Sequence, residues 1–446
     1  MTKQIVVIGG GPAGIEAALS AAGAGAAVTL ISDGPVGGRA GWHSLLPSKV
    51  WLTAADTMGL AAGSAALGLQ SGAAAAAAPE IVARINAVRQ SWNSQQAQAL
   101  TDAGVTLLTG IAAFENAATI LVKNADGDET DRLSPDAVIV AGGSVPYFPP
   151  NLRPDGRRVI APRFAGALDE LPGSVVVIGA GATGSETVYM FNRLGVDVTW
   201  VVDQAGVLPT FAPAAGQFLA ETLARRGVKI VAGPLADRID RDDSGVTVLL
   251  SDGGKLRAEM AFVAIGRSPD LGRLNIEATG AAMAGKSPQV DDFGRTSVPG
   301  LYVVGDAAGP PMLANRAMAQ GWVAGRHAAG AEVAPFRQES VVHAIYTEPQ
   351  VAEVGRVQGD DLHRVRVNFG HSLKSHLQPE GDGFAELAFD AGRRITGAVA
   401  VGPHAADVLS PVAVAIQLYA TLDDIAPIFV AHPTLSELVF AAARRA

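Results

Sequence analysis

The feature that most constrains the fold is a glycine-rich loop that occurs twice, each time between a short apolar segment and a helix-forming segment. The glycines are Gly9, Gly11 and Gly14 in the first copy and Gly179, Gly181 and Gly184 in the second. Residues 5–8 and 175–178 are predicted strands before the loops, and residues 28–31 and 198–202 are predicted strands after the helices. In such a unit the first glycine permits a tight turn, the second lets the backbone approach a pyrophosphate, and the third lets helix and strand pack closely. One such loop can be a plain turn, but two copies about 170 residues apart favour two dinucleotide-binding units.

Length and composition narrow the class of protein further. At about 150 residues per domain, 446 residues suggest about three domains, and 48% hydrophobic residues allow a large core. The net charge of -9 argues against nucleic acid and against anionic membrane surfaces as partners. No run reaches the roughly 18 apolar residues of a membrane span. The N-terminus predicts a strand rather than a signal peptide, so we expect a cytoplasmic protein. The 8 histidines are scattered without ligand spacing, so no metal site is expected.

The chain contains no cysteine, and residues 37–49 read GGRAGWHSLLPSK. This segment resembles the flavin-side active-site helix of the pyridine nucleotide–disulfide oxidoreductase family, which includes dihydrolipoamide dehydrogenase and mercuric reductase. In that family two cysteines lie between the Gly-Gly pair and the Pro-Ser-Lys, and here those positions hold Ala40 and Leu45. The resemblance implies that the chain retains the family's fold but lacks its redox-active cysteine pair. We therefore expect no reduction of disulfides through an internal thiol pair.

Further segments resemble the same family in the same order. They are residues 137–146 (AVIVAGGSVP), 262–269 (FVAIGRSP), 301–307 (LYVVGDA), 312–325 (MLANRAMAQGWVAG), 346–355 (YTEPQVAEVG) and 432–437 (HPTLSE). The resemblance covers nearly the whole chain. It implies an α/β fold with two Rossmann-like domains that bind FAD and NAD(P), and a C-terminal α+β dimerisation domain. The implied domains are residues 1–150 (FAD-binding, first part), 151–270 (NAD(P)-binding), 271–332 (FAD-binding, second part) and 333–446 (dimerisation).

The resemblance also implies flavin ligands beyond the first glycine loop, namely Ala141, Gly142 and Asp306. Asp306 follows an apolar strand and a glycine, where an unpaired carboxylate is costly, and the family uses this residue to bind the ribityl chain. Capping the next helix is the alternative role. The family has His and Glu where Asn315 and Gln320 stand, so the contacts there differ from the family pattern.

The acids that follow the two units are displaced. By the family spacing, the positions of the ribose-binding acids hold Ser32 and Val202, and Asp33 and Asp203 come one residue later. Either acid is a ribose ligand or a plain loop acid, and the sequence leaves both roles open. No arginine follows Asp203 closely to receive a 2'-phosphate, which favours NADH over NADPH.

Two ion pairs are implied around the active site. In the family a lysine matching Lys49 lies by the flavin N5 and pairs with a glutamate that matches Glu186. Such a pair offsets the desolvation of each charge and places positive charge near reduced flavin. The alternative is a lysine that merely extends to water.

The second pair is His432 and Glu437. Pro433 suits a first helical position, so we expect His432 directly before a helix and Glu437 folded back onto the imidazole. In the family this pair crosses the dimer interface to the partner's dithiol and transfers protons. With no thiol to serve, the alternatives are a proton shuttle to another two-electron acceptor and a purely structural role at the interface.

Trp42, His43 and Ser44 lie between the two former cysteine positions. His43 is a candidate proton or hydrogen-bond donor to the flavin, and the alternative is packing that fills the old disulfide channel.

Together these observations imply a homodimeric, FAD-dependent NAD(P)H oxidoreductase. It would pass electrons from NADH through FAD to a small-molecule acceptor other than a disulfide, such as a quinone. Two alternatives are open. One is hydride exchange between NADH and NADP, as in soluble transhydrogenases. The other is a non-catalytic flavoprotein that senses redox state or serves as a subunit of a complex.

Overall fold

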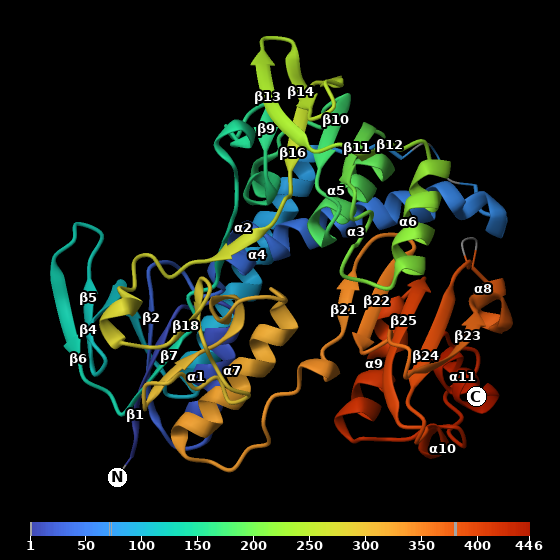
Figure 1. Cartoon of the computed structure of the whole chain (residues 1–446). Coiled ribbons are helices and arrows are strands. Elements are labelled where there is room, and N and C mark those ends of the chain that lie inside the picture. Colours follow the sequence, from blue (N-terminus) through green and yellow to red (C-terminus); the bar gives the residue numbers. More distant parts are fainter. Residues whose placement is uncertain (1, 71, 73, 379–380) are drawn as a thin grey trace. The chain divides into compact units, whose positions relative to one another are not determined.

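The computed structural model describes residues 2–70, 72, 74–378 and 381–446, and the chain forms two compact units. Unit 1 comprises the residues up to Pro47, residues 83–147 and residues 267–337. Unit 2 comprises residues 48–82, 148–266 and 338–446. Each unit is thus assembled from segments far apart in the sequence, as the colours of Figure 1 show.

Unit 1 is built on a parallel sheet with the strand order β20-β7-β1-β2-β3. Its strands β7, β1 and β2 are labelled in Figure 1. Its strands are β1 (Gln4–Ile8), β2 (Ala27–Ser32), β3 (Thr106–Thr109), β7 (Ala137–Val140) and β20 (Leu301–Val303). The central strand β1 reads IVVI over its buried residues, as expected for a parallel strand covered on both faces. In this topology β1, β7, β2 and β20 all end at one edge, which therefore gathers the first glycine loop and the segments after the other strands.

Helices α1 (Pro12–Gly23) and α7 (Ala314–Ala329) pack against each other closely. A Cβ on Gly321 would lie 2.2 Å from the carbonyl oxygen of Ala13, and one on Gly325 would lie 2.3 Å from that of Ala17. The two α7 glycines therefore set how closely the helix backbones approach. Unit 1 also contains the helix α2 (Gly38–His43) and most of α4 (Ala78–Asp102). An antiparallel sheet is formed by β4 (Ile111–Asn116), β5 (Thr119–Lys123) and β6 (Glu129–Leu133).

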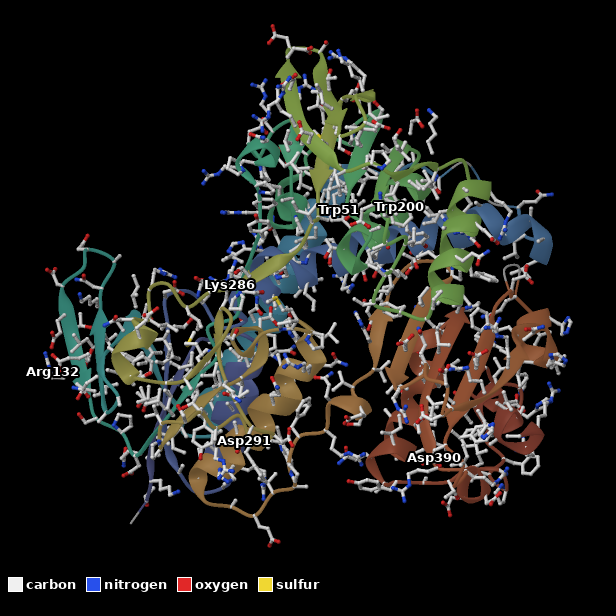
Figure 2. All side chains as sticks on the ribbon, in the orientation of Figure 1. Trp51, Arg132, Trp200, Lys286, Asp291 and Asp390 are labelled. Atoms are coloured by element: carbon white, nitrogen blue, oxygen red, sulfur yellow. The ribbon has the colours of Figure 1, made fainter. Side chains whose placement is uncertain are left out.

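Unit 2 contains a second parallel sheet with the strand order β12-β11-β10-β16-β9. Its strands are β9 (Val159–Ile160), β10 (Ser174–Ile178), β11 (Asp197–Asp203), β12 (Lys229–Gly233) and β16 (Met260–Val263). The helices α3 (Leu45–Gly63, its residues from Ser48 on), α5 (Ala182–Arg193) and α6 (Pro213–Arg225) belong to the same unit. Trp51 of α3 and Trp200 of β11, labelled in Figure 2, are fully buried. An antiparallel sheet of β13 (Ala236–Asp242), β14 (Gly245–Leu250) and β15 (Lys255–Ala258) follows β12.

The C-terminal part of unit 2 is an antiparallel sheet with the order β21-β22-β25-β24-β23. Its strands are β21 (His343–Ile345), β22 (Gln350–Gly355), β23 (His363–Asn368), β24 (Phe384–Phe389) and β25 (Ile395–Gly402). The helices are α8 (Leu373–His376), α9 (Ala405–Gln417), α10 (Leu422–Ile425) and α11 (Glu437–Arg445). Apolar residues of α9 and α11 share one buried core with the sheet, including Val408, Leu409 and Phe440.

The predicted fold class, two Rossmann-like sheets and a C-terminal α+β domain, is confirmed. The four predicted domain ranges stay a prediction. In the described parts of the chain, no helix combines the length and the apolar character that crossing a membrane requires.

Candidate functional site

The first glycine loop has the geometry of a phosphate cradle. Gly9 has φ +112° and its N–H donates to Ile31 (2.8 Å), which continues the sheet into the turn. A Cβ on Gly14 would lie 1.8 Å from the carbonyl oxygen of Gly9, so only glycine allows α1 to start this close to β1. Gly11 caps α1 without any side-chain hydrogen bond, and a Cβ there would meet nothing within 4 Å. A helix N-terminus that no side chain occupies fits the pyrophosphate of FAD.

The second loop, in unit 2, repeats this geometry. Gly179 has φ +108°, and a Cβ on Gly184 would lie 1.9 Å from its carbonyl oxygen. Gly181 is the N-cap residue of α5 and makes no side-chain hydrogen bond, and a Cβ built on it would meet no atom within 4 Å. The indole N–H of Trp200 donates a hydrogen bond to the Gly179 carbonyl oxygen (2.9 Å) and so helps to fix the turn. The two loops are thus equivalent in backbone geometry, and their binding roles stay a prediction.

Asp306 lies in a short 3-10 helix (Gly305–Ala308) directly after β20. Its carboxylate accepts a hydrogen bond from the Ser144 hydroxyl, and the guanidinium of Arg267 lies 4.0 Å away. Arg267 in turn donates to Ser144 Oγ (2.7 Å) and to the Ser144 carbonyl (2.9 Å). The next helix, α7, is capped by Leu313 and not by Asp306, so the helix-cap alternative does not apply. The carboxylate is therefore fixed in an orientation from which it can accept hydrogen bonds from a ligand.

Arg267 and Arg39 were not singled out from the sequence as site residues. Arg39 donates to the carbonyl of Gly142 (2.7 Å) and pairs with Asp270 (2.8 Å), so it holds the segment after β7. Burial lowers the pKa of Arg267, although the nearby Asp306 opposes that change. The only sequence signal for either arginine was its position inside a family-like segment.

Gln320, which stands at the family's Glu position, and the nearby Arg316 contact the backbone around Asp306. Gln320 is buried and its amide oxygen accepts the N–H of Gly305 (2.9 Å). The neighbouring Arg316 is also buried and donates to the carbonyls of Gly309 (2.8 Å) and Pro311 (3.0 Å). Both side chains therefore support the backbone on either side of Asp306.

The two displaced acids differ in their surroundings. Asp33 is exposed and pairs with Arg273 of the same unit. Asp203 ends β11, is exposed, and accepts the N–H of Ala205 (2.9 Å) as in an Asx turn. Both contacts are typical of acidic residues in loops, and the binding of a ribose by either carboxylate stays a prediction.

Lys49 and Glu186 are in contact within unit 2. Lys49 Nζ donates to Glu186 Oε1 (2.6 Å), and the same oxygen accepts the N–H of Tyr346 (3.0 Å). The ammonium also lies 4.3 Å from the centroid of the Tyr346 ring, which adds a cation–π contact. The two charged side chains are 33% and 12% exposed, so the pair is largely withdrawn from water. Tyr346 was missed because its contribution is a backbone N–H and a ring face, which no sequence pattern identifies.

His432 and Glu437 are also in contact. Nδ1 of His432 lies 2.9 Å from Glu437 Oε1, and Oε2 accepts the N–H of Thr434 (2.9 Å). Burial opposes ionisation of Glu437, but the bonds from Thr434 and His432 outweigh it and the pKa of Glu437 lies below its usual value. The imidazole is 63% exposed and open to a ligand.

One expectation about this segment is wrong. Pro433 does not start a helix, because α11 begins at Glu437 with Ser436 as its N-cap. An acid in the first turn suits the positive end of the helix, so Glu437 both starts α11 and binds His432.

The helix α2, which holds the former cysteine position Ala40, is supported by α4. The guanidinium of Arg89 lies 5.6 Å from the Trp42 ring centroid and donates to the Trp42 carbonyl (3.4 Å). Asn93 packs against Gly41, where a Cβ would come within 2.6 Å of Oδ1. Leu45 and His43 are exposed. The position of α2 is thus held by packing on α4 where the family has a disulfide.

Comparisons with known proteins agree with this arrangement. A family model described as "Pyridine nucleotide-disulphide oxidoreductase" matches residues 3–321, and the model of its dimerisation domain matches residues 341–443. The chain is 32% identical over 467 residues to a protein of Mycobacterium tuberculosis named NAD(P)H dehydrogenase (quinone), covering 100% of this chain and 94% of that protein. It is 32% identical over 461 residues to dihydrolipoyl dehydrogenase 2 of Haloarcula marismortui, covering 99% and 96%.

Solved structures show the same similarity. The crystal structure of LpdA from Mycobacterium tuberculosis has a TM-score of 0.94 at 30% identity and covers 100% of this chain and 99% of that chain. The copper(II) complex of RclA from Escherichia coli has a TM-score of 0.86 at 21% identity, with 100% and 99% covered, and shares the fold.

Fold and site together define an FAD-dependent NAD(P)H oxidoreductase with a dimerisation domain. The chain belongs to the pyridine nucleotide–disulphide oxidoreductase family. The sequence-based predictions of the family, the enzyme class and the cofactors FAD and NAD(P)H are thereby confirmed. The complete absence of cysteine rules out an internal dithiol.

Proposed function

We propose that this protein oxidises NADH and reduces a small-molecule quinone. The observation that carries the proposal is a disulfide-reductase frame in which Ala40 and Leu45 replace the two cysteines while Lys49–Glu186 and His432–Glu437 stay paired. The relative named NAD(P)H dehydrogenase (quinone), which matches the whole chain, supports a quinone as the acceptor.

FAD, when bound, supplies two-electron chemistry that takes up hydride from a nicotinamide and gives electrons to an acceptor. Residues of each unit would have separate tasks in this chemistry. Gly11 and the N-terminus of α1 would hold the pyrophosphate, and Asp306, fixed by Ser144 and Arg267, would accept a hydrogen bond from a ribityl hydroxyl. The Lys49 ammonium, held by Glu186, would supply a fixed positive charge that stabilises negative charge on reduced flavin.

His432 is proposed to supply a proton. Reduction of a quinone by NADH consumes one proton besides the hydride, because the products are NAD⁺ and the quinol. Glu437 accepts a hydrogen bond from Nδ1 of His432 and so orients the ring, which leaves Nε2 of the exposed imidazole as the donor of the proton. The His432–Glu437 pair would thus have a proton-transfer role in a chain that has no thiol.

Three further features belong to the proposal. The dimerisation domain supports a homodimer, and we propose a cytoplasmic location. NADH is favoured over NADPH because no arginine follows Asp203 closely in the sequence to receive a 2'-phosphate.

Steady-state turnover tests the proposal. The purified holoenzyme should oxidise NADH in the presence of a soluble quinone and produce one quinol per NADH under anaerobic conditions. Transfer from NADPH to an NAD analogue without a quinone would favour the transhydrogenase-like alternative. No turnover with any quinone, although NADH reduces the flavin, would contradict a quinone acceptor.

A further inference from the structure

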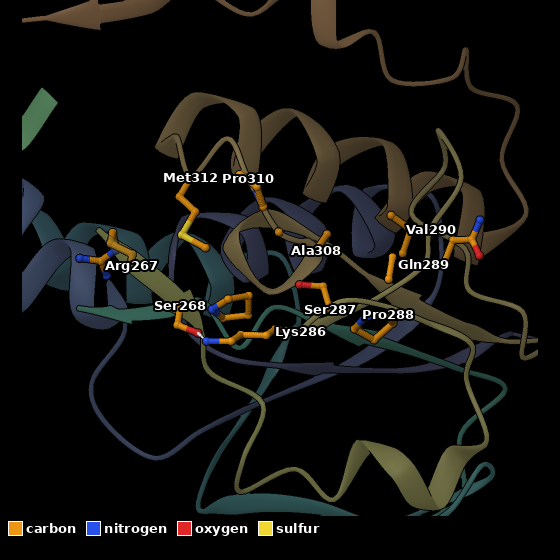
Figure 3. Close-up of a pocket in the computed structure, with 13 residues that line it drawn as sticks. Arg267, Ser268, Lys286, Ser287, Pro288, Gln289, Val290, Ala308, Pro310 and Met312 are labelled. Carbon is orange, nitrogen blue, oxygen red and sulfur yellow. Dashed lines mark hydrogen bonds between the residues drawn. The ribbon is translucent and has the colours of Figure 1, made fainter. Parts of the chain in front are cut away.

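A pocket of about 680 Å³ lies in unit 1, outside both glycine loops (Figure 3). It is bounded by β17 (Arg267–Pro269), by the hairpin of β18 (Met283–Ala284) and β19 (Ser287–Pro288), and by residues 308–312. A volume of several hundred Å³ is typical of small-molecule sites. Of the residues that line it, only Arg267 has a task in the proposed reaction, where it helps to fix Asp306.

The hairpin places a lysine at the mouth of the pocket. Ala284 pairs with Ser287, so Gly285 and Lys286 form a two-residue turn. Gly285 has φ +64°, a conformation that glycine adopts freely and that fits the first position of a type II' turn. The Lys286 ammonium lies 3.5 Å from Ser268 Oγ across the pocket and 5.8 Å from the centroid of the Tyr147 ring. Figure 3 shows Lys286 and Ser268 pointing toward each other.

The pocket is positive in a chain whose net charge is -9. Arg267 and Lys286 both line it, and among the described residues that line it none is Asp or Glu. The acid nearest to Arg267 is Asp306, at 4.0 Å, which already accepts a bond from Ser144. The Lys286 charge has no acidic partner among the lining residues, so an anion would compensate it.

The remaining lining is largely apolar. It is made by Pro269, Pro288, Val290, Ala308, Pro310 and Met312. An apolar wall beside two cations suits a ligand with an acid group on a flat apolar body better than it suits inorganic phosphate, which offers no surface to these side chains.

We propose that this pocket binds a small aryl carboxylate, with the acid group facing Lys286 and Arg267 and the ring against the apolar wall. The bound acid then contacts the same guanidinium that orients Ser144 and Asp306.

Calorimetric titration of the FAD-saturated protein with 2-naphthoate and its neutral analogue 2-naphthamide tests the proposal. Naphthoate should bind once per chain and about tenfold more tightly than the amide, since the two differ in charge and hardly in shape. Lys286→Gln should weaken naphthoate binding about three- to tenfold and leave the amide unchanged. The matched control is Lys123→Gln, which removes an exposed lysine of β5 in the same unit and should change neither ligand.

A second variant tests the cavity itself. Ala284 is an exposed lining residue of β18, so Ala284→Trp fills the mouth without changing charge. It should weaken naphthoate binding more than tenfold. Four results would each overturn the proposal. They are equal affinity for naphthoate and naphthamide, naphthoate binding that neither variant changes, no measurable binding of naphthoate, and binding seen only without FAD.

Discussion

The ion pair of Lys49 and Glu186 predicts a measurable coupling energy. The perturbation is the pair of charge-removing substitutions Lys49→Met and Glu186→Gln, made singly and together. Glu186 Oε1 accepts bonds from Lys49 and from the Tyr346 N–H at 2.6 and 3.0 Å, so the double-mutant cycle isolates only the part that depends on the lysine.

The geometry sets the expected size. A hydrogen bond to a charged group contributes roughly 1.5–3 kcal/mol when buried, and an exposed pair about 0.2–1 kcal/mol. Lys49 is 33% exposed and Glu186 12%, so the pair lies between these limits. We expect a coupling of about 1–2 kcal/mol after discounting for solvent screening at the lysine.

Urea unfolding followed by tryptophan fluorescence is a suitable assay, because Trp51 and Trp200 are fully buried in the unit that holds the pair. Fluorescence and far-UV circular dichroism must give the same transition, which justifies linear extrapolation. The control cycle uses Arg257 and Asp242, an exposed pair of the same unit at 2.8 Å. A Lys49–Glu186 coupling no larger than that of the control would refute the reasoning.

Three other perturbations have defined outcomes. In Gly14→Ala the new Cβ would lie 1.8 Å from the Gly9 carbonyl oxygen, so this variant should lose bound FAD and roughly 1–3 kcal/mol of unfolding free energy. The control Gly23→Ala, whose Cβ would meet nothing within 4 Å, should keep its flavin absorbance. Equal FAD content in the two variants would contradict this expectation. Burial raises the pKa of Glu353 from 4.5 to about 7, so its stabilising contribution is complete below pH 4.5 and is lost as the pH rises through 7. The unfolding free energy of the wild type relative to Glu353→Gln should therefore fall by about 2–3 kcal/mol between pH 5 and 8 in urea titrations, and a difference that does not vary with pH would disprove it. His432→Gln should slow quinone reduction by about 10- to 100-fold while flavin reduction by NADH in stopped flow stays unchanged, and equal slowing of both steps would argue against a proton donor.

Much of the nucleotide-binding frame follows from local sequence. The turn at Gly9 and the close packing at Gly14 depend on glycine at fixed spacing after a buried strand, so they can be predicted without tertiary information. The contact between Lys49 and Glu186 joins residues 137 positions apart, and no local rule predicts it. It followed only from the resemblance to a known family.

The remaining site contacts were not predictable because they depend on how distant segments meet. Arg39 supports Gly142 across 103 positions, and Arg267 reaches Ser144 across 123. The start of α11 was misplaced because Pro433 is a favourable first residue, while Ser436 and Glu437 supply both the cap and the first-turn acid.

The most direct measurement is the number of electrons that the purified holoenzyme takes up per FAD in an anaerobic titration with NADH. A flavin beside a disulfide takes up four electrons, because the two cysteines store one pair, whereas a chain with Ala40 and Leu45 at those positions stores only the flavin pair. We predict full bleaching of the flavin at one NADH per FAD, no thiolate–flavin charge-transfer band, and full recovery of the oxidised spectrum on adding one equivalent of quinone. An uptake of two NADH per FAD, or no reduction by NADH or NADPH, would contradict the proposed function.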